Sequence, residues 1–112
     1  MKPRLAASVF VGALLRLAER DGGFGTVLAK GDATAGTVLI LLAERGKPVE
    51  LLERLLQPDG DYAWRAPLAA AHNADELARF LEKRRRFDPD CWLVELDTAS
   101  AERFAAEIRS LD

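Results

Sequence analysis

The sequence predicts an α+β domain: an antiparallel β-meander of about five strands with helices packed on one face. Three observations lead to this prediction. Residues 37–43 form an unbroken apolar run of strand length between turn residues, which is typical of a strand in the middle of a sheet. Other strand-like runs are joined to it by short turns with glycine or proline, which leave no room for a parallel crossover. Amphipathic segments with helical spacing precede and follow these strands in the chain.

The composition indicates one globular domain over residues 1–112. This length is that of an ordinary domain, and 49% of the residues are hydrophobic, enough to form a core. The formal net charge is −2, so the whole chain has no attraction to nucleic acid or to an acidic membrane. A single cysteine, Cys91, excludes an intramolecular disulfide and any multi-cysteine metal site, and it agrees with a cytoplasmic location.

The start of the chain resembles a signal peptide only superficially. Residues 1–4 include two basic side chains, and an apolar stretch follows. Charged residues then return at helical spacing without a small-residue cleavage site, so we expect this segment to remain part of the domain. The apolar stretch is also shorter than the about 20 residues that a membrane span requires. We predict instead an amphipathic helix over residues 8–21, ended by two glycines.

The next prediction is a hairpin between residues 26–30 and the apolar run at residues 37–43. The connection, residues 31–36, is rich in glycine and includes Asp32, a turn-forming residue. A glycine-rich loop can also bind phosphate. Here neither Gly-Lys-Ser/Thr nor a helix follows the loop, so a structural turn is favoured over a nucleotide site.

Residues 48–56 allow two interpretations. Leucines with charged residues between them fit a helix that has Pro48 in its first turn. The same residues also fit a strand that ends in a turn at residues 57–60, after which residues 62–65 return with large side chains on alternate positions. We prefer the strand, because one hairpin then accounts for both halves.

The last third of the chain predicts a helix, a strand and a helix. The first of these helices begins at Asn73, with Glu76 three residues later in a capping-box arrangement. It ends near Phe87, because Pro89 disfavours a helical conformation of the residue before it. Residues 92–96 then predict the last strand, and residues 98–111 predict a terminal helix.

Two stretches resemble a known family. Residues 86–96, Arg-Phe-Asp-Pro-Asp-Cys-Trp-Leu-Val-Glu-Leu, are similar to the Phe-Asp-Pro-Asp-x-Trp-hydrophobic signature of domain-of-unknown-function family 1491, a group of short alphaproteobacterial proteins. Residues 29–39, Ala-Lys-Gly-Asp-Ala-Thr-Ala-Gly-Thr-Val-Leu, resemble a second block of that family. The resemblance covers most of the chain up to Asp97. It implies a compact α+β domain in a cytoplasmic bacterial protein, favours the strand at residues 49–56, and brings no known activity, cofactor or catalytic residue.

Three groups of residues could carry chemistry, and each also has a structural interpretation. Asp88 and Asp90 flank Pro89 and could act as paired carboxylates, but no third metal ligand lies close in sequence, so a tight turn is favoured. His72, the only histidine, has no nucleophile or orienting partner that the sequence identifies. Cys91 fits a small buried side chain better than an activated thiol. We therefore predict no catalytic residue, metal or cofactor, and an enzyme that uses Asp88, Asp90 or His72 is the weakest alternative.

The only local excess of charge is the basic run at residues 83–86. Cations are favoured at the carboxyl end of a helix, which is a sufficient structural reason for the run. Successive helical residues point in different directions, so we expect Arg84 to point inward and pair with Asp88 or Asp90. Lys83 and Arg86 should stay exposed. Two or three exposed cations give only a weak anion site, so nucleic-acid binding is not expected.

The sequence therefore predicts a small cytoplasmic module that acts through contacts with a partner protein rather than through catalysis. The first alternative is binding of nucleic acid or another anionic ligand through the basic helix end. Trp92 should be buried, because an aromatic side chain of this size usually serves the core, although an exposed tryptophan would indicate an interface. The candidate binding residues are Lys83, Arg84, Arg86, Asp88, Asp90 and Trp92.

Overall fold

Five strands and three helices make up the described part of the computed structural model, residues 5–69 and 71–111. Residues 1–4, which prompted the comparison with a signal peptide, lie outside it. Among the described residues, no helix is long and apolar enough to cross a membrane. The α+β class and the five-stranded sheet are confirmed. The elements in chain order are α1 (Ala7–Arg20), β1 (Phe24–Ala29), β2 (Val38–Glu44), β3 (Lys47–Leu56), β4 (Tyr62–Arg65), α2 (Ala74–Phe87), β5 (Trp92–Asp97) and α3 (Ala101–Arg109).

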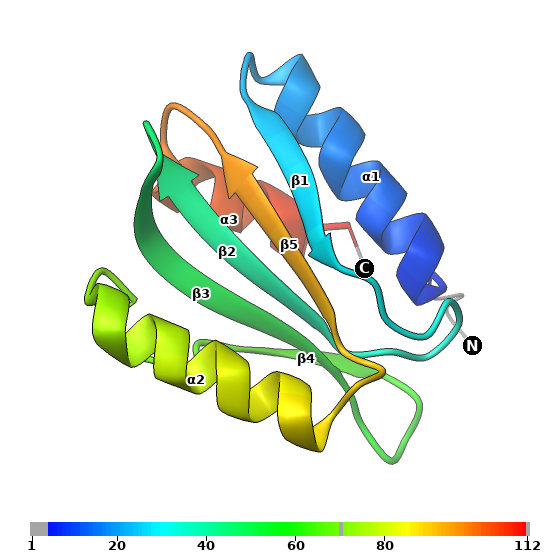
Figure 1. Ribbon diagram of the computed structural model, residues 1–112. Helices are drawn as coiled ribbons and strands as arrows, with labels where there is room; N and C mark the ends of the chain where they lie inside the picture. Colours follow the sequence, from blue (N-terminus) through cyan, green and yellow to red (C-terminus); the bar gives the residue numbers. More distant parts are fainter. Residues whose placement is uncertain (1–4, 70, 112) are drawn as a thin grey trace.

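The strands form a mixed sheet in the order β1-β5-β2-β3-β4 (Figure 1). β1 pairs antiparallel with β5, and β5 pairs parallel with β2. The predicted hairpin between residues 26–30 and 37–43 is therefore wrong, and the sheet is not antiparallel throughout. The prediction considered only turns between successive strands. Three elements separate β2 from β5 and provide the long connection that a parallel pair requires.

The middle of the predicted meander is confirmed. β2 pairs antiparallel with β3, and β3 pairs antiparallel with β4. Arg45 and Gly46 both have positive φ, 52° and 80°, at the turn between β2 and β3, as a two-residue hairpin of the favoured twist requires. The strand interpretation of residues 49–56 is correct, because β3 covers all of them.

Helices cover both faces of the sheet, which corrects the prediction of one covered face. α1 and α3 share one apolar cluster with the sheet, in which Phe10 and Phe104 pack with Ile40. α2 packs on the opposite face, where Leu77 joins Leu39 in a second cluster. Figure 1 shows α2 in front of the sheet and α3 behind it. The reason lies in β2, whose residues from Val38 to Ala43 are all buried: an unbroken apolar strand needs cover on both faces.

The ends of α2 agree with the sequence. The side-chain oxygen of Asn73 accepts hydrogen bonds from the backbone N–H groups of Asp75 and Glu76, both at 3.1 Å. This cap satisfies two of the donors that a helix start leaves unpaired. The helix ends at Phe87, and Asp88 is no longer helical, with φ −139° and ψ 79°.

Candidate functional site

The two stretches that resemble the family meet in space at the start of the parallel pair β2–β5. The backbone N–H of Trp92 donates to the carbonyl of Thr37 at 2.8 Å, and the N–H of Asp32 donates to the carbonyl of Asp90 at 2.9 Å. The indole N–H of Trp92 donates to the carbonyl of Asp32 at 2.7 Å. Trp92 is only 5% exposed, so the expectation of a buried tryptophan is confirmed. These bonds give the two stretches a common structural role, because together they hold β5 beside β2.

The glycines of residues 31–36 are required by close packing. A Cβ atom added to Gly31 would lie 2.1 Å from the carbonyl oxygen of Asp90, and one added to Gly36 would lie 2.6 Å from the same oxygen. Only glycine permits this approach of two backbones. The carboxylate of Asp32 accepts hydrogen bonds from two backbone N–H groups, which lower its pKa. The loop is therefore built as a structural joint.

Asp88 and Asp90 flank a tight turn between α2 and β5, which is the role that the sequence analysis favoured. Their backbone carbonyls accept hydrogen bonds, that of Asp88 from the N–H of Cys91 at 3.1 Å. With Asp32 they border a shallow depression of about 240 Å³. Within the described part of the chain, no three acidic, histidine or cysteine side chains are placed to hold a metal ion. The predicted pairing of Arg84 with Asp88 or Asp90 is wrong, because Arg84 pairs with Glu53.

Cys91 and His72 lie in opposite environments. Cys91 is buried, and its thiol donates to the carbonyl of Trp92 at 3.4 Å. Burial, together with the nearby charge of Asp88, raises the pKa of Cys91 to about 11, so the thiol stays protonated at neutral pH. His72 is exposed immediately before the cap of α2. Within residues 5–69 and 71–111, its imidazole makes no hydrogen bond or ion pair that would orient it as a base.

Arg84 belongs to a cluster of charges that the sequence analysis did not identify. Glu53 on β3 is 1% exposed, and its two carboxylate oxygens receive two guanidinium groups. Nε and Nη2 of Arg65 on β4 donate to Oε1 at 3.0 and 2.9 Å, and Nη1 of Arg84 on α2 donates to Oε2. Glu53 and Arg65 lie directly opposite each other in the β3–β4 register, so they are cross-strand neighbours. We call Glu53, Arg65 and Arg84 the Glu53 triad.

The next residue of β3, Arg54, is fully buried on the opposite face. Its guanidinium carbon lies 4.1 Å from the ring centre of Phe10 and 3.5 Å from that of Tyr62, and Nη2 donates to the carbonyl of Leu5 at 2.7 Å. Successive residues of a strand point to opposite faces, so Glu53 and Arg54 bring one buried charge to each side of the sheet. Two charged residues between pairs of leucines were the sequence signal of this arrangement.

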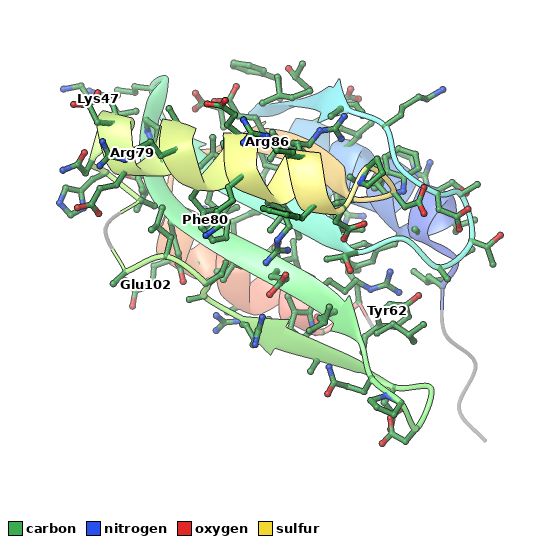
Figure 2. The ribbon with its side chains drawn as sticks, turned by 60° about the horizontal axis from the view of Figure 1, so that its bottom comes forward. Lys47, Tyr62, Arg79, Phe80, Arg86 and Glu102 are labelled. Carbon is green, nitrogen blue, oxygen red and sulfur yellow. The ribbon has the colours of Figure 1, made fainter. Side chains whose placement is uncertain are left out.

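A groove runs along α2 beside the Glu53 triad. It has a volume of about 280 Å³ and is lined by Phe80, Lys83, Arg84 and Phe87, which we call the α2 groove. The helical spacing of three or four residues places these side chains on one face. Figure 2 shows Phe80 on the sheet side of the helix and Arg86 on the opposite side. Arg84 is partly buried, 21% exposed, and lies over the ring of Phe80.

Exposed charges surround the α2 groove. Lys83 and Arg86 are exposed, as predicted. Arg86 pairs with Glu82 at 3.1 Å, and together with Arg79 these residues border a second depression that shares Lys83 and Phe87 with the groove. Three cations and one carboxylate give this side of α2 a local excess of positive charge. Such an excess favours an acidic ligand.

Comparisons with known proteins identify the family. The model of the family described as "Protein of unknown function (DUF1491)" matches residues 5–106. This chain belongs to the DUF1491 family. The resemblance of residues 29–39 and 86–96 is thereby confirmed. No curated protein matches the chain.

Three solved structures show the same fold. The crystal structure of a DUF1491 family protein from Caulobacter crescentus CB15 is 34% identical, with a TM-score of 0.75, and the match covers 90% of this chain and 94% of that one. The NMR structure of a DUF1491 family protein from the same organism is 35% identical, with a TM-score of 0.77 and coverage of 92% and 94%. The solution structure of protein Atu0922 from A. tumefaciens is 32% identical, with a TM-score of 0.72 and coverage of 88% and 89%.

The DUF1491 signature contains two aromatic side chains with different surroundings. Trp92 lies in the core, whereas Phe87 is 74% exposed, more than any other large hydrophobic side chain of the described residues. Phe87 therefore contributes little to the folded core, and it lies beside the cations of the α2 groove. The sequence analysis used Phe87 as the end of a helix and as part of the family signature, but did not predict its exposure. The available signal was the helical spacing of Phe80 and Phe87, which places both rings on the same face of α2.

Proposed function

We propose that this DUF1491 protein is a non-catalytic interaction module whose α2 groove binds an apolar and acidic segment of a partner protein. The observation that carries the proposal is the exposure of Phe87 next to Phe80, Lys83 and Arg84. We place the module in the cytoplasm, for which the single cysteine is the support.

The side chains of the groove are those that contribute most to protein interfaces. Burying one exposed phenylalanine stabilises a complex by about 1.5–3 kcal/mol through removal of apolar area from water. Aromatic residues and arginine are also enriched among the residues that dominate binding energies. Lys83 lines the groove, and Arg79 and Arg86 border the adjoining depression with Glu82 as the single carboxylate among them. An acidic segment is therefore attracted to the same place where Phe87 offers apolar contact.

The candidate catalytic groups support binding rather than chemistry. The thiol of Cys91 is buried and protonated, and the backbone carbonyls of Asp88 and Asp90 serve the joint with residues 31–36. Neither arrangement supplies a nucleophile with a base in reach.

Nucleic-acid binding through the basic helix end is the second candidate. Strong binding requires about six to ten contacts with phosphates. Arg84 is engaged with Glu53 and Arg86 with Glu82, which leaves Lys83 and Arg79 as the cations of this side without an ion pair in the described part of the chain. We therefore expect duplex DNA or RNA to bind no more tightly than micromolar at physiological salt.

The test uses NMR chemical shifts of backbone amides during titration of a capped, amidated peptide in which Asp and Glu alternate with Leu and Phe. We expect saturable shifts over the residues of the α2 groove, and their loss in Phe87→Ala. The matched control is Phe24→Ala, because Phe24 is also a largely exposed phenylalanine, 57%, but lies on β1. Absence of shifts at the groove with millimolar peptide, or equal effects of the two substitutions, contradicts the proposal. Nanomolar binding of duplex DNA that the double change Lys83→Glu with Arg86→Glu abolishes would establish the second candidate instead.

A further inference from the structure

The Glu53 triad places three charges where apolar side chains would hold β3, β4 and α2 together. Removing a carboxylate from water is unfavourable, and the attraction to its partners repays this only in part. Exchange of a buried ion pair for apolar residues is often neutral or stabilising, so stability alone is a weak reason for the triad. A second effect of the triad is geometric, because Glu53 holds each of two guanidinium groups in one place.

The held guanidinium of Arg84 faces the α2 groove. Arg84 uses Nη1 for Glu53, and a guanidinium group has five N–H donors in a fixed planar arrangement. Arg84 is a lining residue of the groove, between Phe80 and Phe87 and next to Lys83. The triad contains two positive charges and one negative charge, so its net charge is positive. Lys83 adds a further positive charge at the same place.

We propose that Lys83 and Arg84 bind a side-chain carboxylate of the partner segment, and that Glu53 is a positioning residue that orients Arg84 for this contact. The inference rests on the proposed function and specifies its chemistry. The apolar neighbour of that carboxylate lies between Phe80 and Phe87. A planar guanidinium group matches the two oxygens of a carboxylate, and such charged hydrogen bonds are about twice as strong as neutral ones. Because Arg84 is already held, little side-chain freedom is lost when the ligand binds.

The first experiment compares two peptides. One is the acidic peptide described above, and the other has Asn and Gln at the acidic positions, so that shape is kept and charge is removed. We expect the acidic peptide to bind at least about tenfold more tightly, as one charged hydrogen bond to the partly buried Arg84 provides. Equal affinities would overturn this inference while leaving the groove as an apolar docking site. Binding of the Asn and Gln peptide only when its carboxyl terminus is left free would overturn the assignment to a side chain.

The second experiment measures the ratio of the two affinities in variants of the triad. Removal of the negative charge of Glu53 would by itself strengthen binding of an acidic peptide, because the two arginines lose their counter-ion. If Glu53 orients Arg84, Glu53→Gln instead lowers the preference for the acidic peptide by about tenfold and leaves binding of the uncharged peptide unchanged. An increased preference in Glu53→Gln would overturn the positioning role.

Two further variants complete the comparison. Glu50→Gln is the matched control, because Glu50 lies on the same strand and its partly exposed side chain is paired at 3.9 Å with Arg109 of α3 rather than with α2. It should leave the affinity ratio unchanged. Arg65→Gln changes a mostly exposed member of the triad and keeps the experiment informative if Glu53→Gln does not fold. It should reduce the preference for the acidic peptide in the same direction, and an unchanged ratio in Arg65→Gln would count against the triad as an orienting device.

Discussion

Replacement of Trp92 by alanine tests whether the two family stretches form the central joint of the fold. Trp92 is 5% exposed and packs in the cluster shared by α1, α3 and the sheet. Truncation of a buried tryptophan costs about 3–5 kcal/mol, because apolar contacts are lost and a cavity remains. The indole N–H also donates to the carbonyl of Asp32 at 2.7 Å, and loss of this bond adds about 1 kcal/mol.

The measurement is the free energy of unfolding from urea denaturation followed by circular dichroism. Trp92→Phe separates the two contributions, because it keeps a ring in the core and removes the indole donor. It should therefore be less harmful than Trp92→Ala. Phe87→Ala is the matched control, since Phe87 belongs to the same signature but is exposed. It should change stability by less than about 0.5 kcal/mol. A Trp92→Ala protein within about 0.5 kcal/mol of wild type would refute the reasoning, as surface substitutions have effects of that size.

Three further predictions concern the joint and its neighbours. Gly31→Ala should destabilise the protein by at least about 1–3 kcal/mol in urea denaturation, because the added Cβ would lie 2.1 Å from the carbonyl oxygen of Asp90. Gly12→Ala is the control and should not destabilise the protein, because the added Cβ would meet only a 3.5 Å contact within α1. The pKa of Asp32 is lower in the folded protein than its ordinary value of 3.8, so its contribution to stability is present above that value and is lost as pH falls through the folded pKa. The stability difference between wild type and Asp32→Ala should therefore shrink below pH 3.8, and a difference that grows on acidification contradicts the assignment. Cys91, with its pKa raised to about 11, should resist iodoacetamide at mildly alkaline pH until urea is added, as mass spectrometry would show; rapid labelling of the native protein would rule out the buried, protonated thiol.

Local sequence patterns were sufficient to predict most of the elements. The strand at residues 49–56, the cap at Asn73 and the end of α2 near Phe87 all follow from turn residues, capping chemistry and the periodicity of apolar side chains. The same patterns correctly predicted that Trp92 is buried and that Lys83 is exposed. These features depend on the residues within about one or two turns of the position concerned, which the sequence presents directly.

Only the tertiary structure decided which strands pair and what the buried charges contact. A strand can pair along both of its edges, and local sequence patterns do not indicate a partner that is distant in the chain. The turns between successive strands therefore did not predict that β5 lies between β1 and β2. The position of α2 on the second face followed from the cover that β2 needs on both sides. Arg84 pairs with Glu53 rather than with Asp88 or Asp90 because packing of α2 on the sheet brings together residues that are 31 positions apart. Arg84 belongs both to the α2 groove and to the Glu53 triad, which joins two strands to a helix. The position of Arg84 in the groove is therefore set only in the folded protein.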